Sequence, residues 1–280
     1  MKKYLLALLA ICAFTTLSIA QKTDSTNHKK IKIINNGRFY GSWGYNTEWY
    51  THSSIAIDQP GMQNNYTFEN LSAHDHIGWD NLFHVQLSIP QYNYRIGYFF
   101  NEAQDWGVEI NFDHAKYVTT QGYTAEVKGT INGRNNIDTM VYLNDKSLRW
   151  QLNNGANWFH VNIVRKLSII NTKDNNFMIC ALFKAGIGPC VPHVDDVVFG
   201  HQNPPHFQVG GINAGLEGDI RFIFFKYAYL EYCNTLDYAD YWGLRIYQGT
   251  AKQNFGAYEM IANIGFTFHL GKTAGTNTAL

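Results

Sequence analysis

Asp113 and His160 are the residues of this chain best suited to acid–base chemistry. A carboxylate beside an imidazole can orient the imidazole as a general base. Asp113 is followed directly by His114, but adjacent residues of a strand point to opposite faces, so these two cannot share a pocket without a bulge. His160 can face Asp113 from a neighbouring strand. We therefore take Asp113 and His160 as the candidate catalytic pair, although no serine stands beside His160 as a nucleophile.

Two further groups of side chains could bind a metal ion. Imidazole and carboxylate suit zinc and similar ions, but the spacing of neither group matches a defined site. We predict that these side chains are solvated loop residues and that the chain holds no metal and no cofactor. The first group is His74, Asp75, His76 and His84, and the second is His193, Asp195, Asp196, His201 and His206.

The elements that must position these residues have an alternating pattern of polarity. Residues 92–100 and 105–114 each read as a strand with one apolar face and one polar face. A soluble β-sandwich would show the same alternation with its apolar face turned inward. Because the pattern recurs along the whole chain and follows a secretion signal, we predict that the apolar faces contact lipid. The apolar faces carry Tyr92, Tyr94, Ile96, Tyr98, Phe100, Trp106, Val108, Ile110 and Phe112; the opposite faces carry Asn93, Arg95, Gly97, Gly107, Glu109, Asn111 and Asp113.

The first 20 residues have the features of a cleaved signal peptide. Lys2 and Lys3 precede a short apolar run, and Ser18-Ile-Ala20 provides small residues at the cleavage site. After Ala20 no apolar run approaches the roughly 20 residues that a membrane helix needs. The formal net charge of zero gives no basic surface for nucleic acid, so we expect no nucleic-acid partner.

Three cysteines follow the signal peptide: Cys180, Cys190 and Cys233. An odd number at irregular spacing is not a disulfide framework. Two alternatives remain open from the sequence, a bridge between Cys180 and Cys190 or buried free thiols.

The connections between the expected strands alternate in length. Short turns are expected near 101–104, 171–176 and 225–226, and long loops at 51–89, 120–154, 190–206 and 239–254. This alternation is typical of bacterial barrels with short periplasmic turns and longer extracellular loops. It predicts an all-β, antiparallel up-and-down transmembrane barrel of eight strands over residues 37–270, with both termini in the periplasm. A ten-stranded barrel results if residues 63–72 and 82–89 also cross. Residues 21–36 are expected to be a flexible arm and residues 271–280 a polar tail.

The chain resembles the small outer-membrane β-barrel proteins of Gram-negative bacteria, the OmpA-type and related eight-to-ten-stranded barrels. The resemblance rests on the signal peptide, the alternating strands and the aromatic-rich last strand ending Gly265-Phe-Thr-Phe268. It implies a location in the outer membrane of a Gram-negative bacterium, in contact with membrane lipid and lipopolysaccharide. It also implies insertion by the barrel-assembly machinery. Such barrels often end at the terminal aromatic residue, whereas this chain continues through residues 271–280.

An eight-stranded barrel is just wide enough for side chains to fill it. The expected inward-facing charges would then pair across the interior and plug it, because unpaired buried charges are costly. We therefore favour a non-enzymatic outer-membrane barrel with a structural or surface-interaction role. The alternatives are an outer-leaflet enzyme of lipid A acyl chemistry, a narrow small-solute channel and, for the fold, a soluble secreted β-sandwich. The expected interior network is Glu48, Arg95, Glu109, Asp113, Lys184, Glu217, Asp219, Arg221, Glu231 and Glu259.

Overall fold

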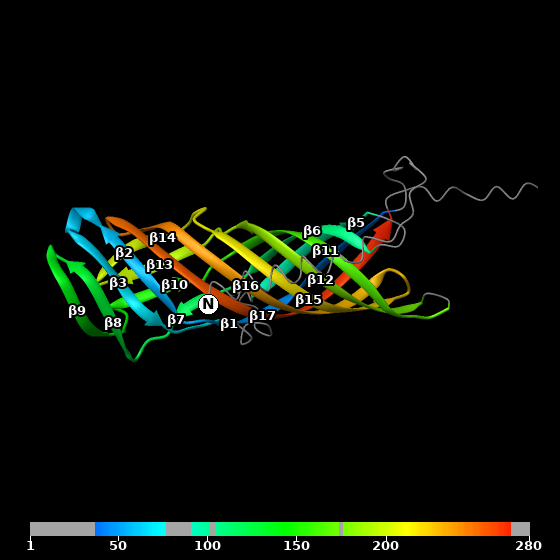
Figure 1. Ribbon diagram of the computed structural model, residues 1–280, viewed down its shortest axis with the longest axis horizontal. Helices are drawn as coiled ribbons and strands as arrows, with labels where there is room; N and C mark the ends of the chain where they lie inside the picture. Colours follow the sequence, from blue (N-terminus) through cyan, green and yellow to red (C-terminus); the bar gives the residue numbers. More distant parts are fainter. Residues whose placement is uncertain (1–36, 77–90, 101–104, 174–175, 270–280) are drawn as a thin grey trace, which may run out of the picture. The chain divides into compact units, whose positions relative to one another are not determined.

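The computed structural model describes residues 37–76, 91–100, 105–173 and 176–269, whose strands form two antiparallel sheets (Figure 1). The expected signal peptide, N-terminal arm and polar tail lie outside these residues, as do the turn at 101–104 and the segment 82–89. No helix in the described part of the chain is long and apolar enough to cross a membrane.

The larger sheet closes on itself into a ring. β1 pairs with β17 along its whole length, from Arg38 opposite His269 to Tyr50 opposite Ala257. The prediction of an all-β, antiparallel up-and-down sheet is therefore confirmed. Around the ring, neighbouring strands follow in the order β1 (Arg38–Tyr50), β5 (Tyr92–Phe99), β6 (Trp106–His114), β11 (Trp158–Asn171), β12 (Phe177–Pro189), β15 (Ile212–Phe224), β16 (Ala228–Ile246) and β17 (Gly249–His269).

Four more strands extend the same sheet beyond the ring. The first half of β17 leaves β1 and pairs with β2 instead, with Thr250 opposite Asp58 and Gln253 opposite Ile55. The segment considered as an extra barrel strand, near 63–72, belongs to this extension and lies outside the ring. The extension runs β2 (Ser53–Gln59), β3 (Asn64–Leu71), β8 (Thr124–Ile131) and β9 (Arg134–Tyr142), with a short 3-10 helix at Pro60–Met62.

The second sheet packs at the same end as this extension (Figure 1). Its order is β14 (His201–Phe207), β13 (His193–Val198), β10 (Leu148–Leu152), β7 (Tyr117–Thr119) and β4 (Ala73–His74). An apolar core joins the two sheets. The ring of Phe255 in the larger sheet stacks on Tyr117 of the second sheet with 4.5 Å between centroids. Within the larger sheet, the indole of Trp158 donates a 2.6 Å hydrogen bond to the Tyr241 hydroxyl. The region expected to be long loops is thus a packed layer with its own core.

The prediction of a fourth long loop at 239–254 is wrong. β16 and β17 have 19 and 21 residues and are joined by a tight turn at Tyr247 and Gln248. A transmembrane strand needs about 9–11 residues, so both strands continue well beyond that length. The alternation of facing persists to the tip, but its inward side becomes apolar, with Ala239, Tyr241 and Phe255 in the core.

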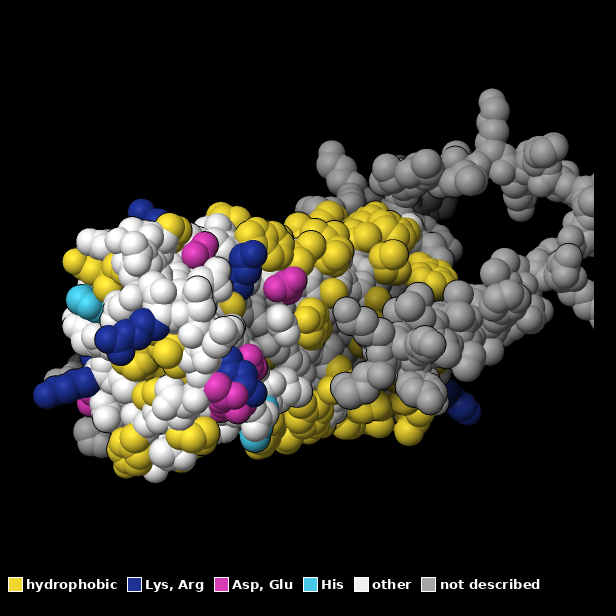
Figure 2. Space-filling model, turned by 60° about the vertical axis from the view of Figure 1, so that its left-hand side comes forward, with side chains coloured by type: hydrophobic (Ala, Val, Ile, Leu, Met, Phe, Trp, Pro, Cys, Tyr) yellow, Lys and Arg dark blue, Asp and Glu magenta, His cyan; other side chains and the backbone are white. Residues whose placement is uncertain are grey.

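The ring strands have inverted polarity. Arg95 is 1% exposed, whereas its neighbours Tyr94 and Ile96 are 51% and 67% exposed. The same alternation places Glu109 inside between the exposed Val108 and Ile110. Figure 2 shows hydrophobic side chains gathered over the ring strands and mostly polar side chains at the far end. The charged face of each strand is therefore enclosed and the apolar face is turned outward.

Asp196 is an ionisable group enclosed in the second sheet. It lies on β13 opposite Trp150 of β10, and neither of its carboxylate oxygens has a hydrogen-bond partner among the described residues. Burial, together with the neighbouring Asp195, raises the pKa of Asp196 to about 7. The folded protein therefore favours the neutral acid at this position.

We expect the Asp196→Asn variant to flatten the pH dependence of stability. The stabilising contribution of the protonated Asp196 is complete below its unfolded pKa of about 4 and is lost as pH rises through about 7. Unfolding in urea, followed by tryptophan fluorescence, should show a fall between about pH 4 and about pH 8 that the variant lacks. An unchanged slope in the variant would contradict the assignment.

Candidate functional site in the barrel interior

A network of ion pairs crosses the interior of the ring. Nη1 of Arg95 on β5 lies 2.7 Å from Oε2 of Glu217 on β15 and 3.2 Å from Oε1 of Glu109 on β6. Its Nη2 lies 3.6 Å from Oδ1 of Asp113. All four side chains are nearly completely buried. They face the interior of the ring, as the alternation of polar and apolar residues along the strands predicts. Arg95 links three strands that are not all neighbours in the ring.

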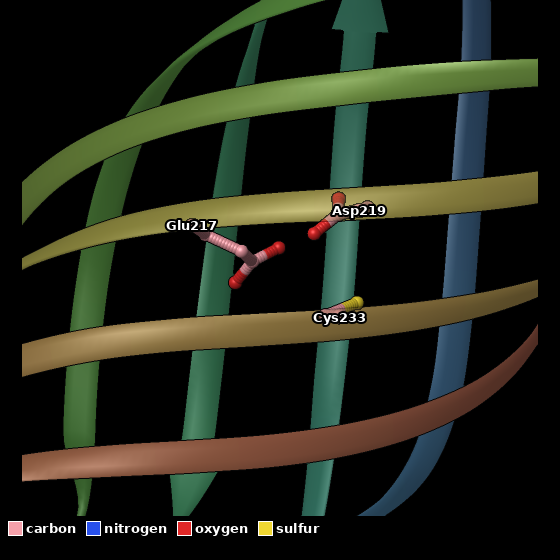
Figure 3. Close-up of side chains that lie close together, drawn as sticks. All are labelled: Glu217, Asp219 and Cys233. Carbon is pink, nitrogen blue, oxygen red and sulfur yellow. The ribbon is translucent and has the colours of Figure 1, made fainter.

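Lys184 of β12 occupies the centre of this network. Its Nζ lies 2.9 Å from Glu109, 2.8 Å from Glu217 and 3.0 Å from Asp219. Glu217, Asp219 and Cys233 form the one group among the described residues whose ligand atoms are close enough for a metal ion (Figure 3). The Lys184 ammonium already provides the positive charge there, so this group belongs to the ion-pair network.

The interior is aromatic and cationic near the short turns. Arg221 pairs with Glu231 on the neighbouring strand β16. Its guanidinium lies 4.5 Å from the ring centre of Tyr40 and 4.1 Å from that of Tyr229. Cation–π contacts of this kind favour a desolvated arginine. Both tyrosine rings are buried inside the barrel and fill its interior at the end where the short turns lie, which we call the lower end.

The remaining acidic residues gather on the other side of the network. Glu48 and Glu259, both expected in the charge network, face each other in the β1–β17 ladder. Glu48 accepts hydrogen bonds from the amides of Asn46 and Gln91, and neither oxygen of Glu259 has a partner among the described residues. Glu48 interacts electrostatically with the cationic Lys116, so the pairing of these two carboxylates with opposite charges stays a prediction.

The structure brings Asp113 and His160 close together. Nδ1 of His160 lies 4.0 Å from Oδ2 of Asp113, and its Nε2 lies 3.5 Å from Oδ1 of Asp237. Sequence reasoning did not identify Asp237, although it continues the inward alternation of Glu231, Cys233 and Thr235 along β16. His114 instead bonds Asn157 at 2.8 Å. Both candidate catalytic residues are buried, so their chemistry is confined to what the barrel encloses.

The two loop groups do not assemble around a common point within the described residues. Asp75 accepts hydrogen bonds from the Thr47 hydroxyl and from the backbone N–H of Glu48. His193 packs on Phe207 and His201 stacks on Tyr247. His84 lies outside the described residues.

The three cysteines Cys180, Cys190 and Cys233 are buried free thiols. Of the two alternatives that the sequence left open, the structure has the unbridged one. Burial raises the pKa of Cys190, at the outer end of the ring, to about 11, which keeps this thiol protonated and unreactive.

No protein-family model and no curated protein matches this chain. Among solved structures, the outer membrane protein OprG from Pseudomonas aeruginosa is similar at 13% identity and a TM-score of 0.38, covering 86% of this chain and 100% of that one. The Neisserial surface protein A gives 8% identity, coverage of 84% and 98%, and a TM-score of 0.35. The outer membrane protease OmpT from Escherichia coli gives 8% identity, coverage of 87% and 100%, and a TM-score of 0.36.

We expect Lys184→Met to destabilise the barrel strongly. The change leaves Glu109, Glu217 and Asp219 without their shared ammonium, and removing one partner of a buried ion pair costs about 3–5 kcal/mol. Urea unfolding from lipid vesicles, followed by fluorescence, measures this loss. The matched control is Lys128→Met, since the exposed Lys128 pairs with Glu126 at 2.8 Å on the surface and should lose little. Equal losses in the two variants would show that the network contributes nothing.

Proposed function

We propose that this chain is an integral outer-membrane β-barrel protein of a Gram-negative bacterium, with a structural or surface-interaction role. The eight ring strands cross the membrane in this proposal, and the barrel interior is plugged. Residues 1–20 act as the cleaved signal peptide, and the barrel-assembly machinery inserts the chain. Membrane lipid and lipopolysaccharide are then the molecules that surround it.

The inverted polarity of the ring carries this proposal. An exposed Ile96 beside an enclosed Arg95 is unfavourable in water, because it leaves apolar surface wetted while a charge is desolvated. The same arrangement suits a bilayer, where a closed ring satisfies every backbone hydrogen bond and apolar side chains contact acyl chains. The pattern continues around the ring in Val161, Phe183, Leu216, Leu230 and Ile264, all of which are exposed.

Both ends of the interior are occupied by side chains, which supports a closed barrel. The ion pairs of Lys184 and Arg95 fill the middle, and Arg221 with its two tyrosines fills the lower end. The apolar core around Phe255 and Trp158 covers the upper end, where the extension and the second sheet lie. A protein of this kind acts through its surface, and we expect no reproducible conductance in planar bilayers.

The part beyond the ring is the proposed interaction surface. The extension and second sheet are held together by their own apolar core, and their outer surface is mostly polar at the end shown in Figure 2. A folded layer of this size at the long-connection end would stand on the cell surface, since short turns face the periplasm in bacterial barrels.

Ile96→Arg tests the membrane placement. Arginine on the lipid face near the bilayer centre costs about 2–4 kcal/mol. The free energy of unfolding from vesicles should therefore fall by that amount. Met140→Arg is the control, because Met140 is 60% exposed and Ile96 is 67% exposed, but Met140 lies on β9 beyond the ring. We expect a change within about 0.5 kcal/mol for the control. If the two variants behave alike and the protein extracts without detergent, the chain is a soluble β-sandwich.

Cysteine labelling tests the orientation. The three native cysteines in the described part of the chain are buried, so a new exposed cysteine is the expected site of reaction with a membrane-impermeant maleimide. Asp138→Cys on β9 should be labelled on intact cells, whereas Lys226→Cys in a short turn should be labelled only after the outer membrane is permeabilised. The reverse pattern would place the extension in the periplasm and remove the surface role.

A further inference from the structure

The ring strands bury more acid than base. Among the described residues they enclose three cationic side chains, Arg95, Lys184 and Arg221, and eight carboxylates. A fourth buried cation, Lys116, lies just beyond β6 and interacts electrostatically with Glu48, so acid still exceeds base. The cations make their short contacts with only some of these acids. The eight are Glu48, Glu109, Asp113, Glu217, Asp219, Glu231, Asp237 and Glu259.

The excess acid is gathered in one place, which we call the acidic chamber: Glu48, Asp113, Asp237 and Glu259, with His160. Glu48 and Glu259 are direct cross-strand neighbours, an arrangement that is destabilising for two carboxylates. Glu259 also interacts electrostatically with Asp113 and Asp237. Asp113 borders the apolar core, because its register partner is Trp158, a residue of that core.

Hydrogen-bond acceptors in the chamber exceed the protein donors that reach them. Within the described residues, both oxygens of Glu259, both of Asp237 and one of Asp113 have no hydrogen-bond donor. The Nε2 of His160 also has no hydrogen-bond partner there, and the His160 side chain is 2% exposed. Arg95 reaches the chamber only through Nη2, 3.6 Å from Asp113. A buried ionised carboxylate is costly unless it is paired, hydrogen-bonded or bound to a cation, and otherwise it takes up a proton.

We propose that the acidic chamber binds one hydrated divalent cation of the hard class, Mg²⁺ or Ca²⁺. Carboxylate oxygen is the ligand that both ions prefer. The ion would offset the charge of Glu48 and Glu259 on one side and of Asp113 and Asp237 on the other. It would join β1, β6, β16 and β17 from within, above the level of Lys184.

The spacing of the ligand atoms indicates that the ion keeps some of its water. Among the described residues, only Glu217, Asp219 and Cys233 bring three ligand atoms within 4.8 Å of one another, so the four chamber carboxylates cannot all bind one ion directly. Mg²⁺ characteristically binds through one or two carboxylates while retaining water ligands. Those waters would donate hydrogen bonds to the remaining carboxylate oxygens.

Refolded protein in phosphatidylcholine vesicles, which lack anionic lipid, tests the proposal. Because the chamber is enclosed, Mg²⁺ or Ca²⁺ is added in one arm during refolding and in another after it, with Na⁺ at matched ionic strength as the salt control. After gel filtration, elemental analysis should find about one bound ion per chain. The urea concentration at the midpoint of unfolding should rise in the presence of the bound divalent ion, Mg²⁺ or Ca²⁺, and should not rise with Na⁺.

Glu259→Gln and Glu48→Gln remove one chamber charge each while keeping side-chain size. Both should fold, as judged by heat-modifiable gel migration, and bind the ion at least about tenfold more weakly because one ligand charge is lost. Glu126→Gln is the control, because this β8 side chain is 39% exposed and lies outside the ring, and it should bind as the unmodified protein does. The proposal is overturned if neither ion exceeds the amount held by vesicles alone, since the carboxyls are then simply protonated. It is equally overturned if the two chamber variants keep full binding, which would place the ion elsewhere.

Discussion

The hydrogen-bonded seam between β1 and β17 is the constraint on which the rest of the structure depends. It joins residues near the two ends of the described chain, with Arg38 opposite His269. Without it the sheet would have two open edges, and the distinction between an enclosed and an outer face would be lost. Once the seam forms, the two-residue alternation of each strand decides which side chains are enclosed. The charged residues then have only one another, the aromatic rings and the backbone as neighbours.

The enclosed space is layered along the barrel. Arg221 with its tyrosines lies nearest the short turns, Lys184 and its carboxylates follow, and Glu48 and Glu259 come next. The apolar core around Phe255 completes the series. Positive charge therefore gives way to negative charge and then to apolar packing. A sequence of layers of this kind fixes the register of the strands, because a slip of one residue would turn arginine and glutamate outward.

Sequence periodicity predicts the strands of the ring and the direction in which their side chains face. It does not predict the sheets beyond the ring. The positions of Arg95, Glu109 and Lys184 inside the barrel follow from alternation alone, since each is flanked by apolar residues. Residues 239–254 resemble a loop in sequence because polar residues and glycines are frequent among them. Its inward positions, Ala239, Tyr241 and Phe255, carry the alternation onward with apolar side chains. The close approach of His160 to Asp237 depends on how the ring curves, which no local pattern encodes.

The buried cysteines have a consequence for how the chain is made. A barrel that crosses the periplasm unfolded would expose Cys180, Cys190 and Cys233 to an oxidising compartment. In the folded structure all three are buried and unbridged. If the chain reaches the membrane through the periplasm, as proposed, its thiols escape oxidation only when the seam closes before a disulfide forms.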